Sequence, residues 1–139
     1  MPSIRYQRLA SELLPLANKF YKSQRSPMRV GRSEQVWVAQ HVDIIAACCL
    51  KPVADGHWLT ALLVAREQRQ QGIASQLLSE LRAHSQGPIW LFCAPELLDF
   101  YRRQGFAPCD DLPAELTERL LRYQRKQPLL ALAAPQQCG

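Results

Sequence analysis

The chain has 139 residues, a formal net charge of +5 and a hydrophobic content of 47%. These values fit one compact domain with a sizeable core, and we expect residues 1–139 to form that single domain. No apolar run reaches the roughly 20 residues of a membrane helix, and the first residues lack the pattern of a signal peptide. We therefore expect a soluble cytoplasmic protein without a membrane partner. The positive charge suits anionic partners, but the basic residues are dispersed and charge alone does not choose one.

The cysteines match neither a disulfide framework nor a metal site. Their number is odd, no C-x-x-C pair occurs, and the three histidines are scattered. Cys48, Cys49, Cys93 and Cys109 stand in apolar surroundings. We expect no metal, and reduced cysteines that pack as small hydrophobic residues.

In the first half of the chain, the pattern predicts a strand over residues 3–9, a helix over 11–21 and a loop over 24–34. Three further strands are predicted over residues 35–40, 43–50 and 57–65. Ser11 is the expected N-cap of the helix, and Pro15 falls in its first turn. The Asp55-Gly56 pair predicts the turn of a hairpin. The strand after this turn is almost continuously apolar, so we expect both of its faces to be covered.

In the second half, the pattern predicts helices over residues 72–82, 95–104 and 113–126. They alternate with strands over residues 89–93, near 106 and over 129–134. Pro95 suits the first turn of its helix, and Gly105 ends that helix. The last few residues are expected to fray. The order β-α-β-β-β-α-β-α-β-α-β indicates an α/β domain whose mixed sheet combines hairpins with crossovers.

A lone glycine, Gly72, stands where a predicted strand ends and an amphipathic helix begins. The first amides of a helix have no intrahelical acceptor, and together with the helix dipole they favour an anion. Arg69 adds a charge that can pair with phosphate. The patterns G-x-x-x-x-G-K-[ST] and G-x-G-x-x-G are both absent from the chain, which excludes a P-loop and leaves a Rossmann site unsupported.

Two segments resemble the signatures of the GNAT superfamily of N-acetyltransferases. The stretch "RQQGIA" is similar to the [QR]-x-x-G-x-[GA] motif, with Arg69, Gly72 and Ala74 at its defined positions. The stretch "DFYRRQGFAP" resembles the late signature F-Y-x-x-x-G-F. Many members place an asparagine six residues before the F-Y pair, where this chain has Ala94. The resemblance spans about residues 36–108 and implies a GNAT-like acyl-CoA N-acyltransferase fold with six to seven strands and flanking helices.

The resemblance implies acetyl-coenzyme A as co-substrate. In this family, amides of the strand before the motif bind the pantetheine arm, and amides of the motif hold the pyrophosphate. The implied cofactor-binding residues are Leu62, Leu63, Val64, Arg69, Gln70, Gln71, Gly72, Ile73, Ala74 and Ser75. The backbone N–H of Leu63 or Val64 would stabilise negative charge on the thioester oxygen. The implied reaction is direct transfer of the acetyl group to a primary amine of a small molecule, peptide or protein.

Proton transfer needs further groups, because an alkyl amine arrives mostly protonated and the thiolate leaves without a proton. Tyr101 matches the family's general acid. His57 has a suitable unperturbed pKa for the base and is the first candidate. Glu34 and Asp43 are further candidates, and a water chain or capture of already neutral amine also remains open.

Two other functions stay in view. A catalytically weak sensor that binds acetyl-coenzyme A and regulates a protein partner is one alternative. A nucleic-acid-binding module rests on charge alone, without an aromatic-basic surface motif, and is disfavoured. The family's acceptor cleft corresponds to loops near residues 21–34 and 110–113, whose basic side chains hint at an anionic or polar acceptor. We expect a monomer or a homodimer.

Overall fold

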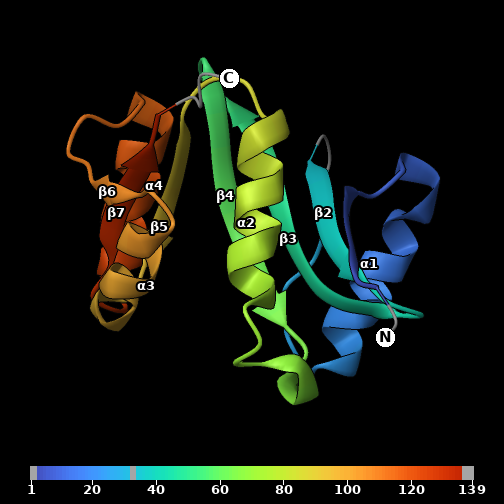
Figure 1. Cartoon of the computed structure of the whole chain (residues 1–139). Helices are drawn as coiled ribbons and strands as arrows, with labels where there is room; N and C mark the ends of the chain where they lie inside the picture. Colours follow the sequence, from blue (N-terminus) through green and yellow to red (C-terminus); the bar gives the residue numbers. More distant parts are fainter. Residues whose placement is uncertain (1–2, 32–33, 136–139) are drawn as a thin grey trace.

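Residues 3–31 and 34–135, which the computed structural model describes, form one seven-stranded sheet with four α-helices in the predicted order (Figure 1). The strands are β1 Arg5–Arg8, β2 Gln35–Gln40, β3 Ile44–Val53, β4 Gly56–Val64, β5 Ile89–Cys93, β6 Ala107–Pro108 and β7 Leu130–Ala134. The helices are α1 Leu14–Ser23, α2 Ile73–His84, α3 Leu98–Arg103 and α4 Ala114–Gln124. The expected fraying of the last residues concerns 136–139, which lie outside the described residues.

The sheet has the order β1-β2-β3-β4-β5-β7-β6, and all neighbouring strands are antiparallel except β4 and β5. These two parallel strands pair at their first residues, His57 with Ile89 and Trp58 with Trp90. Beyond this point the two strands diverge, so the sheet opens along their C-terminal halves (Figure 1). The mixed sheet predicted from the element order is therefore confirmed.

Helices cover both faces of the sheet. The apolar side of α2, with Leu77 and Leu81, packs in one core with Leu59 of β4. On the opposite face, α1 closes a second core, and Leu116 of α4 joins Trp58 in a third. Leu59 and Trp58 thus enter different cores, which confirms that both faces of β4 are covered.

The hairpin between β3 and β4 turns one residue earlier than predicted. Val53 pairs with Gly56, so the turn consists of Ala54 and Asp55, with Ala54 in a left-handed conformation at φ 49°. The prediction of an Asp55-Gly56 turn was therefore wrong by one position. Gly56 is required for another reason: a Cβ there would lie 2.1 Å from the carbonyl oxygen of Pro88.

The first helix also begins differently from the prediction. A 3-10 turn, Ser11–Leu13, precedes α1, and Leu13 is the N-cap of the α-helix. The Ser11 hydroxyl contacts the Glu12 carboxylate at 3.3 Å and caps no helix. The position of Pro15 in the first turn is confirmed.

Cys48, Cys49 and Cys93 are buried free thiols and Cys109 is partly buried, as predicted. Within residues 3–31 and 34–135, no helix is both long and apolar enough to cross a bilayer. The same residues contain no group of three or more His, Cys, Asp or Glu side chains arranged to hold a metal ion.

Candidate active site

A β-bulge interrupts β4 beside the point where β4 and β5 diverge. The register between β3 and β4 shifts opposite Cys48, where β4 carries one extra residue. Ala61 lies at this bulge with φ 59°, a left-handed conformation that costs an alanine free energy. A bulge bends its strand and re-aims the neighbouring side chains. The strained residue is therefore maintained by the structure around it.

Tyr21 of α1 holds the bulge in place. Its hydroxyl donates a 2.7 Å hydrogen bond to the carbonyl oxygen of Ala61 and lies 3.8 Å from the Cys49 sulfur. The Tyr21 side chain is fully buried. Burial raises the pKa of Tyr21, so its hydroxyl stays protonated and able to donate.

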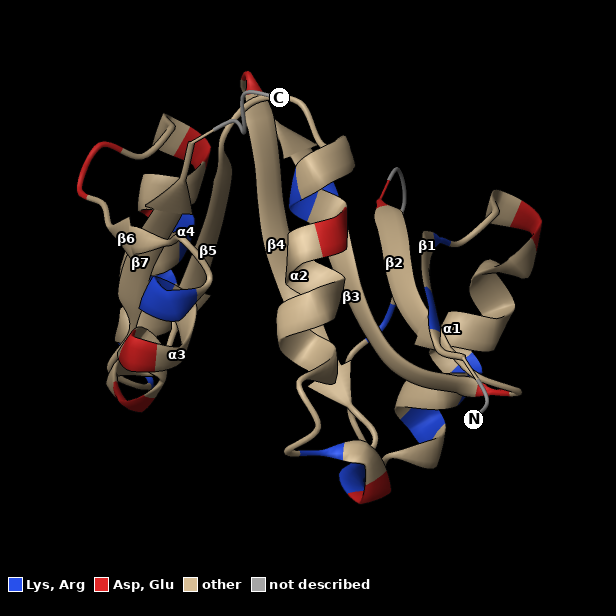
Figure 2. Cartoon of the chain, viewed as in Figure 1, with Lys and Arg blue, Asp and Glu red and all other residues tan. Residues whose placement is uncertain are grey.

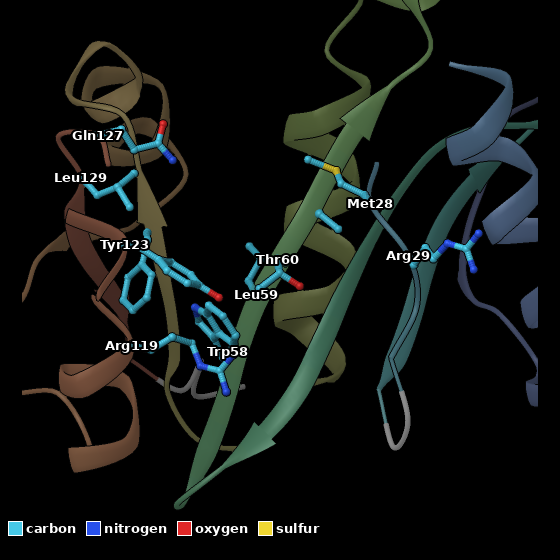
Figure 3. A pocket seen from close by; sticks show the side chains of 11 residues that line it. Met28, Arg29, Trp58, Leu59, Thr60, Arg119, Tyr123, Gln127 and Leu129 are labelled. Atoms are coloured by element: carbon cyan, nitrogen blue, oxygen red, sulfur yellow. The ribbon is translucent and has the colours of Figure 1, made fainter. Parts of the chain in front are cut away.

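Two cavities flank the divergent strands. The larger, which we call the α2 cavity, has a volume of about 830 Å³ and is lined by residues 62–64, 68–70, 72–75, 97, 100, 101 and 103. The smaller, the α4 cavity, has a volume of about 410 Å³ and is lined by residues 28, 29, 58–61, 92, 119, 123, 127 and 129 (Figure 3). Ala61 lines the α4 cavity and Leu62, the next residue of β4, lines the α2 cavity, so both cavities reach the bulge.

The start of α2 presents free amides to the α2 cavity. Gly72 is the N-cap with φ 76°, and the first helical hydrogen bond joins the Gln76 amide to the Gly72 carbonyl at 3.0 Å. The amides of Ile73, Ala74 and Ser75 come before Gln76, the first donor of the helical hydrogen bonds, and therefore have no intrahelical partner. Together with the helix dipole they favour an anion in the cavity.

The turn before α2 combines unusual backbone geometry with positive charge. Gln70, like Gly72, has a positive φ, at 65°. A Cβ at Gly72 would meet nothing within 4 Å, so glycine is favoured there by its backbone conformation rather than by crowding within the chain. Arg69 Nε donates to the carbonyl oxygen of Val64 at 3.2 Å, which ties the turn to the end of β4. Figure 2 shows basic residues in this loop.

Tyr101 of α3 forms part of the wall of the α2 cavity. Its side chain is 8% exposed and packs edge-on against Phe100 and Phe106, with ring centroids 5.0 and 5.9 Å away. Burial, with smaller contributions from Cys93 and Cys48, raises the pKa of Tyr101 to about 12. The hydroxyl is therefore a stable donor at neutral pH.

The structure brings Tyr101 and nine of the ten sequence-predicted cofactor residues to the α2 cavity; Gln71 does not line it. The cofactor residues predicted from the sequence leave out four residues that line the cavity: Gln68, Leu97, Phe100 and Arg103. Leu97 lies three residues before Phe100 and four before Tyr101, and Arg103 lies three after Phe100, which could have indicated a shared face.

The predicted base, His57, lies apart from this group. It is the second residue of β4, and its backbone N–H donates to the Pro88 carbonyl at 2.9 Å. It lies five positions before Leu62, a rise of roughly 16 Å along an extended strand. Burial, with a smaller contribution from Arg8, lowers the pKa of His57 and favours its neutral form.

The two further base candidates also lie outside both cavities. The Glu34 carboxylate accepts the Gly31 amide at 2.9 Å. Asp43 follows β2 and lines a separate hollow beside α1. Their predicted role therefore gains no support from their positions.

The fold thus combines a mixed sheet, a divergent strand pair and a cavity at a helix start that favours an anion. The family model of the "Acetyltransferase (GNAT) domain" matches residues 32–108, more than half of the chain. The chain therefore belongs to the GNAT acetyltransferase family. The predicted enzyme class, an acyltransferase, is confirmed at the level of the family.

Solved structures share the fold at low sequence identity. A GNAT-family acetyltransferase from Staphylococcus aureus Mu50 has a TM-score of 0.67 at 14% identity, with 97% of this chain and 100% of that chain covered. Tetrahymena GCN5 has a TM-score of 0.70 at 11% identity, with 96% of each chain covered. N-acetylglutamate synthase from Neisseria gonorrhoeae, complexed with coenzyme A and N-acetyl-glutamate, has a TM-score of 0.67 at 16% identity, with 99% of this chain but 36% of that chain covered. No curated protein matches the chain significantly.

Proposed function

We propose that this protein transfers the acetyl group of acetyl-coenzyme A to the primary amine of a small molecule or peptide. The observation that carries the proposal is that two cavities reach neighbouring residues of the β4 bulge, Ala61 in one and Leu62 in the other. A phosphorylated thioester in the α2 cavity and an amine in the α4 cavity would place their reacting atoms at this junction. Holding both reactants in one geometry lowers the entropic barrier.

The α2 cavity has the features that coenzyme A requires. The free amides of Ile73, Ala74 and Ser75 suit a pyrophosphate, and Arg69 supplies a nearby positive charge. Within the described chain, β4 pairs with β5 only at His57 and Trp58 and then diverges from it. On the side that faces β5, Leu62–Val64 can therefore offer backbone groups to the pantetheine amides. The solved structure of N-acetylglutamate synthase contains coenzyme A, which is consistent with this assignment.

Acetyl-coenzyme A would supply the acetyl group as a thioester. As the amine nitrogen forms the new C–N bond, negative charge would develop on the carbonyl oxygen, and the backbone N–H of Leu63 or Val64 would stabilise it. The C–S bond would then break, and the proton lost by the nitrogen would pass, directly or through water, to the departing thiolate to give free coenzyme A. Tyr21 supports this step indirectly by fixing the bulge at Ala61.

Tyr101 would interact with the departing sulfur. Its pKa of about 12 lies roughly 3.5 units above that of an ordinary thiol, so complete proton transfer to the thiolate is uphill. A hydrogen bond from the Tyr101 hydroxyl nevertheless stabilises the developing negative charge. We therefore assign Tyr101 the role of hydrogen-bond donor to the departing thiolate. It would act as a full general acid only in a complex in which the bound cofactor lowers its pKa.

The amine would reach the junction in its neutral form. Among the described residues that line the two cavities there is no aspartate, glutamate or histidine. This arrangement favours capture of already neutral amine over a base such as His57. The rate at low amine concentration should then rise with pH toward the amine's own pKa, near roughly 10.4.

The test is release of free thiol from acetyl-coenzyme A in the presence of a panel of amines. The wild type should show amine-dependent release, and Tyr101→Phe should lower kcat about 100-fold while binding coenzyme A as before. Tyr6→Phe, on the edge strand β1, serves as the matched control and should leave kcat unchanged. A protein that binds coenzyme A but acetylates no amine would instead support the sensor function.

A further inference from the structure

The α4 cavity contains two buried N–H donors that lack partners. Trp58 Nε1 and Arg119 Nε are inaccessible to solvent, and neither has a hydrogen-bond acceptor in the described part of the chain. Buried donors are almost always paired, because an unpaired donor loses its bond to water without compensation. Because solvent does not reach these two atoms in this geometry, a ligand in the cavity would first contact the accessible part of the Arg119 guanidinium.

The two donors stand side by side. The Arg119 guanidinium carbon lies 4.8 Å from the centre of the Trp58 ring, and the Tyr123 ring lies 6.5 Å from that ring. Figure 3 shows the three side chains together at one side of the cavity, whereas Arg29 points away from them. The stacked tryptophan restricts the guanidinium, so the position of its donors is preorganised.

The charge around these donors is positive. Within the described residues, the lining of the cavity contains two arginines and no acidic side chain. Glu115 lies 3.9 Å from Arg119 Nη2, but the same carboxylate oxygen lies 3.8 Å from Lys51 Nζ. One carboxylate between two cations leaves an excess positive charge. The cavity therefore disfavours a second ammonium group and favours an anion.

Apolar side chains form part of the remaining lining. Phe92, Leu59 and Leu129 line it beside the aromatic faces of Trp58 and Tyr123. A volume of about 410 Å³ falls within the range of sites for small molecules. The ligand should therefore combine an apolar body with one anionic group.

We propose that the acceptor is a primary amine that carries a carboxylate on an apolar body, and that the Arg119 guanidinium, stacked on Trp58, binds this carboxylate. The inference rests on the proposed function, which places the amine in this cavity. A planar carboxylate matches the fork of an arginine. Binding would orient the amine toward the bulge.

The test compares matched amines that differ in the carboxylate alone. Three pairs cover short and long separations between amine and carboxylate: phenylalanine with phenylalaninamide, ε-aminocaproate with ε-aminocaproamide, and alanylphenylalanine with its amide. At least one acid should exceed its amide in kcat/KM by about 10-fold or more. Arg119→Gln should remove this preference by raising KM for the acid, and Arg119→Lys should restore part of it. Arg122→Gln, an exposed arginine on the same helix, is the matched control.

The outcomes separate the inference from the function on which it rests. Equal or faster acetylation of every amide, or a preference for the acid that survives Arg119→Gln, overturns the inference and leaves the acetyltransferase function standing. A protein that binds acetyl-coenzyme A but transfers acetyl to none of the six amines contradicts the proposed function, and the inference with it. Calorimetric binding of coenzyme A to Arg119→Gln, unchanged from wild type, shows that this variant remains folded.

Discussion

The Tyr21 hydroxyl donates a 2.7 Å hydrogen bond to the carbonyl oxygen of Ala61, a residue 40 positions away in the sequence. This contact joins helix α1 to the bulge of β4. Ala61 has a left-handed backbone and lines the α4 cavity, next to Leu62 of the α2 cavity. A buried tyrosine outside both cavities thus controls the strand geometry on which the proposed transfer depends.

Replacing Tyr21 with phenylalanine should therefore affect both stability and turnover. The change leaves the Ala61 carbonyl without its donor, which should cost about 1–3 kcal/mol of unfolding free energy. A bulge free to relax would also lower kcat. Urea denaturation and steady-state kinetics measure the two effects, with Tyr6→Phe as control. A variant with reduced stability but unchanged kcat would show that the bulge geometry does not matter for transfer.

Two glycines with similar backbone angles should respond differently to alanine. Gly72 and Gly87 have φ of 76° and 79°, but an added Cβ meets nothing near Gly72 and lies 2.0 Å from the Asp55 carbonyl oxygen at Gly87. Gly72→Ala should cost about 1 kcal/mol, the conformational penalty alone. Gly87→Ala should cost clearly more, because backbone must move. Equal losses in urea denaturation would contradict this difference in packing.

Arg82 fixes the end of α3 against α2. Its Nη1 donates to the Gln104 carbonyl at 2.8 Å, and its guanidinium lies 5.7 Å from the centre of the Phe106 ring. Arg82→Met keeps the apolar stem but removes the donor, so we expect a loss of about 1 kcal/mol and a several-fold lower kcat as Tyr101 shifts. The control, Arg102→Met, alters an exposed arginine of α3 and should change neither quantity. Similar effects in the two variants would refute this positioning role.

The buried thiols and phenols predict loss of stability at alkaline pH. Burial raises the pKa of Cys48 well above 9.0, and burial is the largest of the causes that raise the pKa of Cys49 and of Tyr101 to about 12. Above about pH 9 the unfolded chain releases protons that the folded chain retains, so the free energy of unfolding falls as pH rises toward 12. The Tm should decline between pH 8 and about pH 11.

Cys48→Ala provides the check on this pH dependence. Alanine removes one ionisable group from the core, so the decline in Tm should be less steep than in the wild type. A parallel decline in the two proteins would mean that the Cys48 thiol does not contribute.

The sequence predicts the elements well because their signals are local. Hydrophobic periodicity and the Gly72 and Gly105 positions indicate α2 and the end of α3 without tertiary information. The position of the hairpin turn was missed because it depends on Ala54 adopting a positive φ, which an alanine does not signal. It also depends on close backbone approaches at Gly56 and Gly87, which are made to residues on the far side of the turn and of α2.

The part of the site that consists of backbone amides was predictable from the sequence. The amides near Gly72 follow from a strand-to-helix turn, and Tyr101 follows from a motif. The bulge at Ala61 was not predictable, because an alanine carries no signal for a left-handed conformation. The pairing of Trp58 with Arg119 was missed because 61 positions separate them and the fold alone brings them together. His57 was a plausible base by its pKa, but its place early in β4 separates it from Tyr101.

Calorimetric titration of coenzyme A into the Ala74→Asp variant tests the central claim most directly. Ala74 lines the α2 cavity in the first turn of α2. An aspartate there suits the helix dipole but repels a pyrophosphate. The wild type should bind coenzyme A, and Ala74→Asp should bind it at least 10-fold more weakly. The control Gln76→Glu should bind as the wild type does, because Gln76 is an exposed residue of the same turn that lies outside the cavity lining. Absence of binding by the wild type, or equal affinity of the three proteins, would contradict a pyrophosphate site at the start of α2.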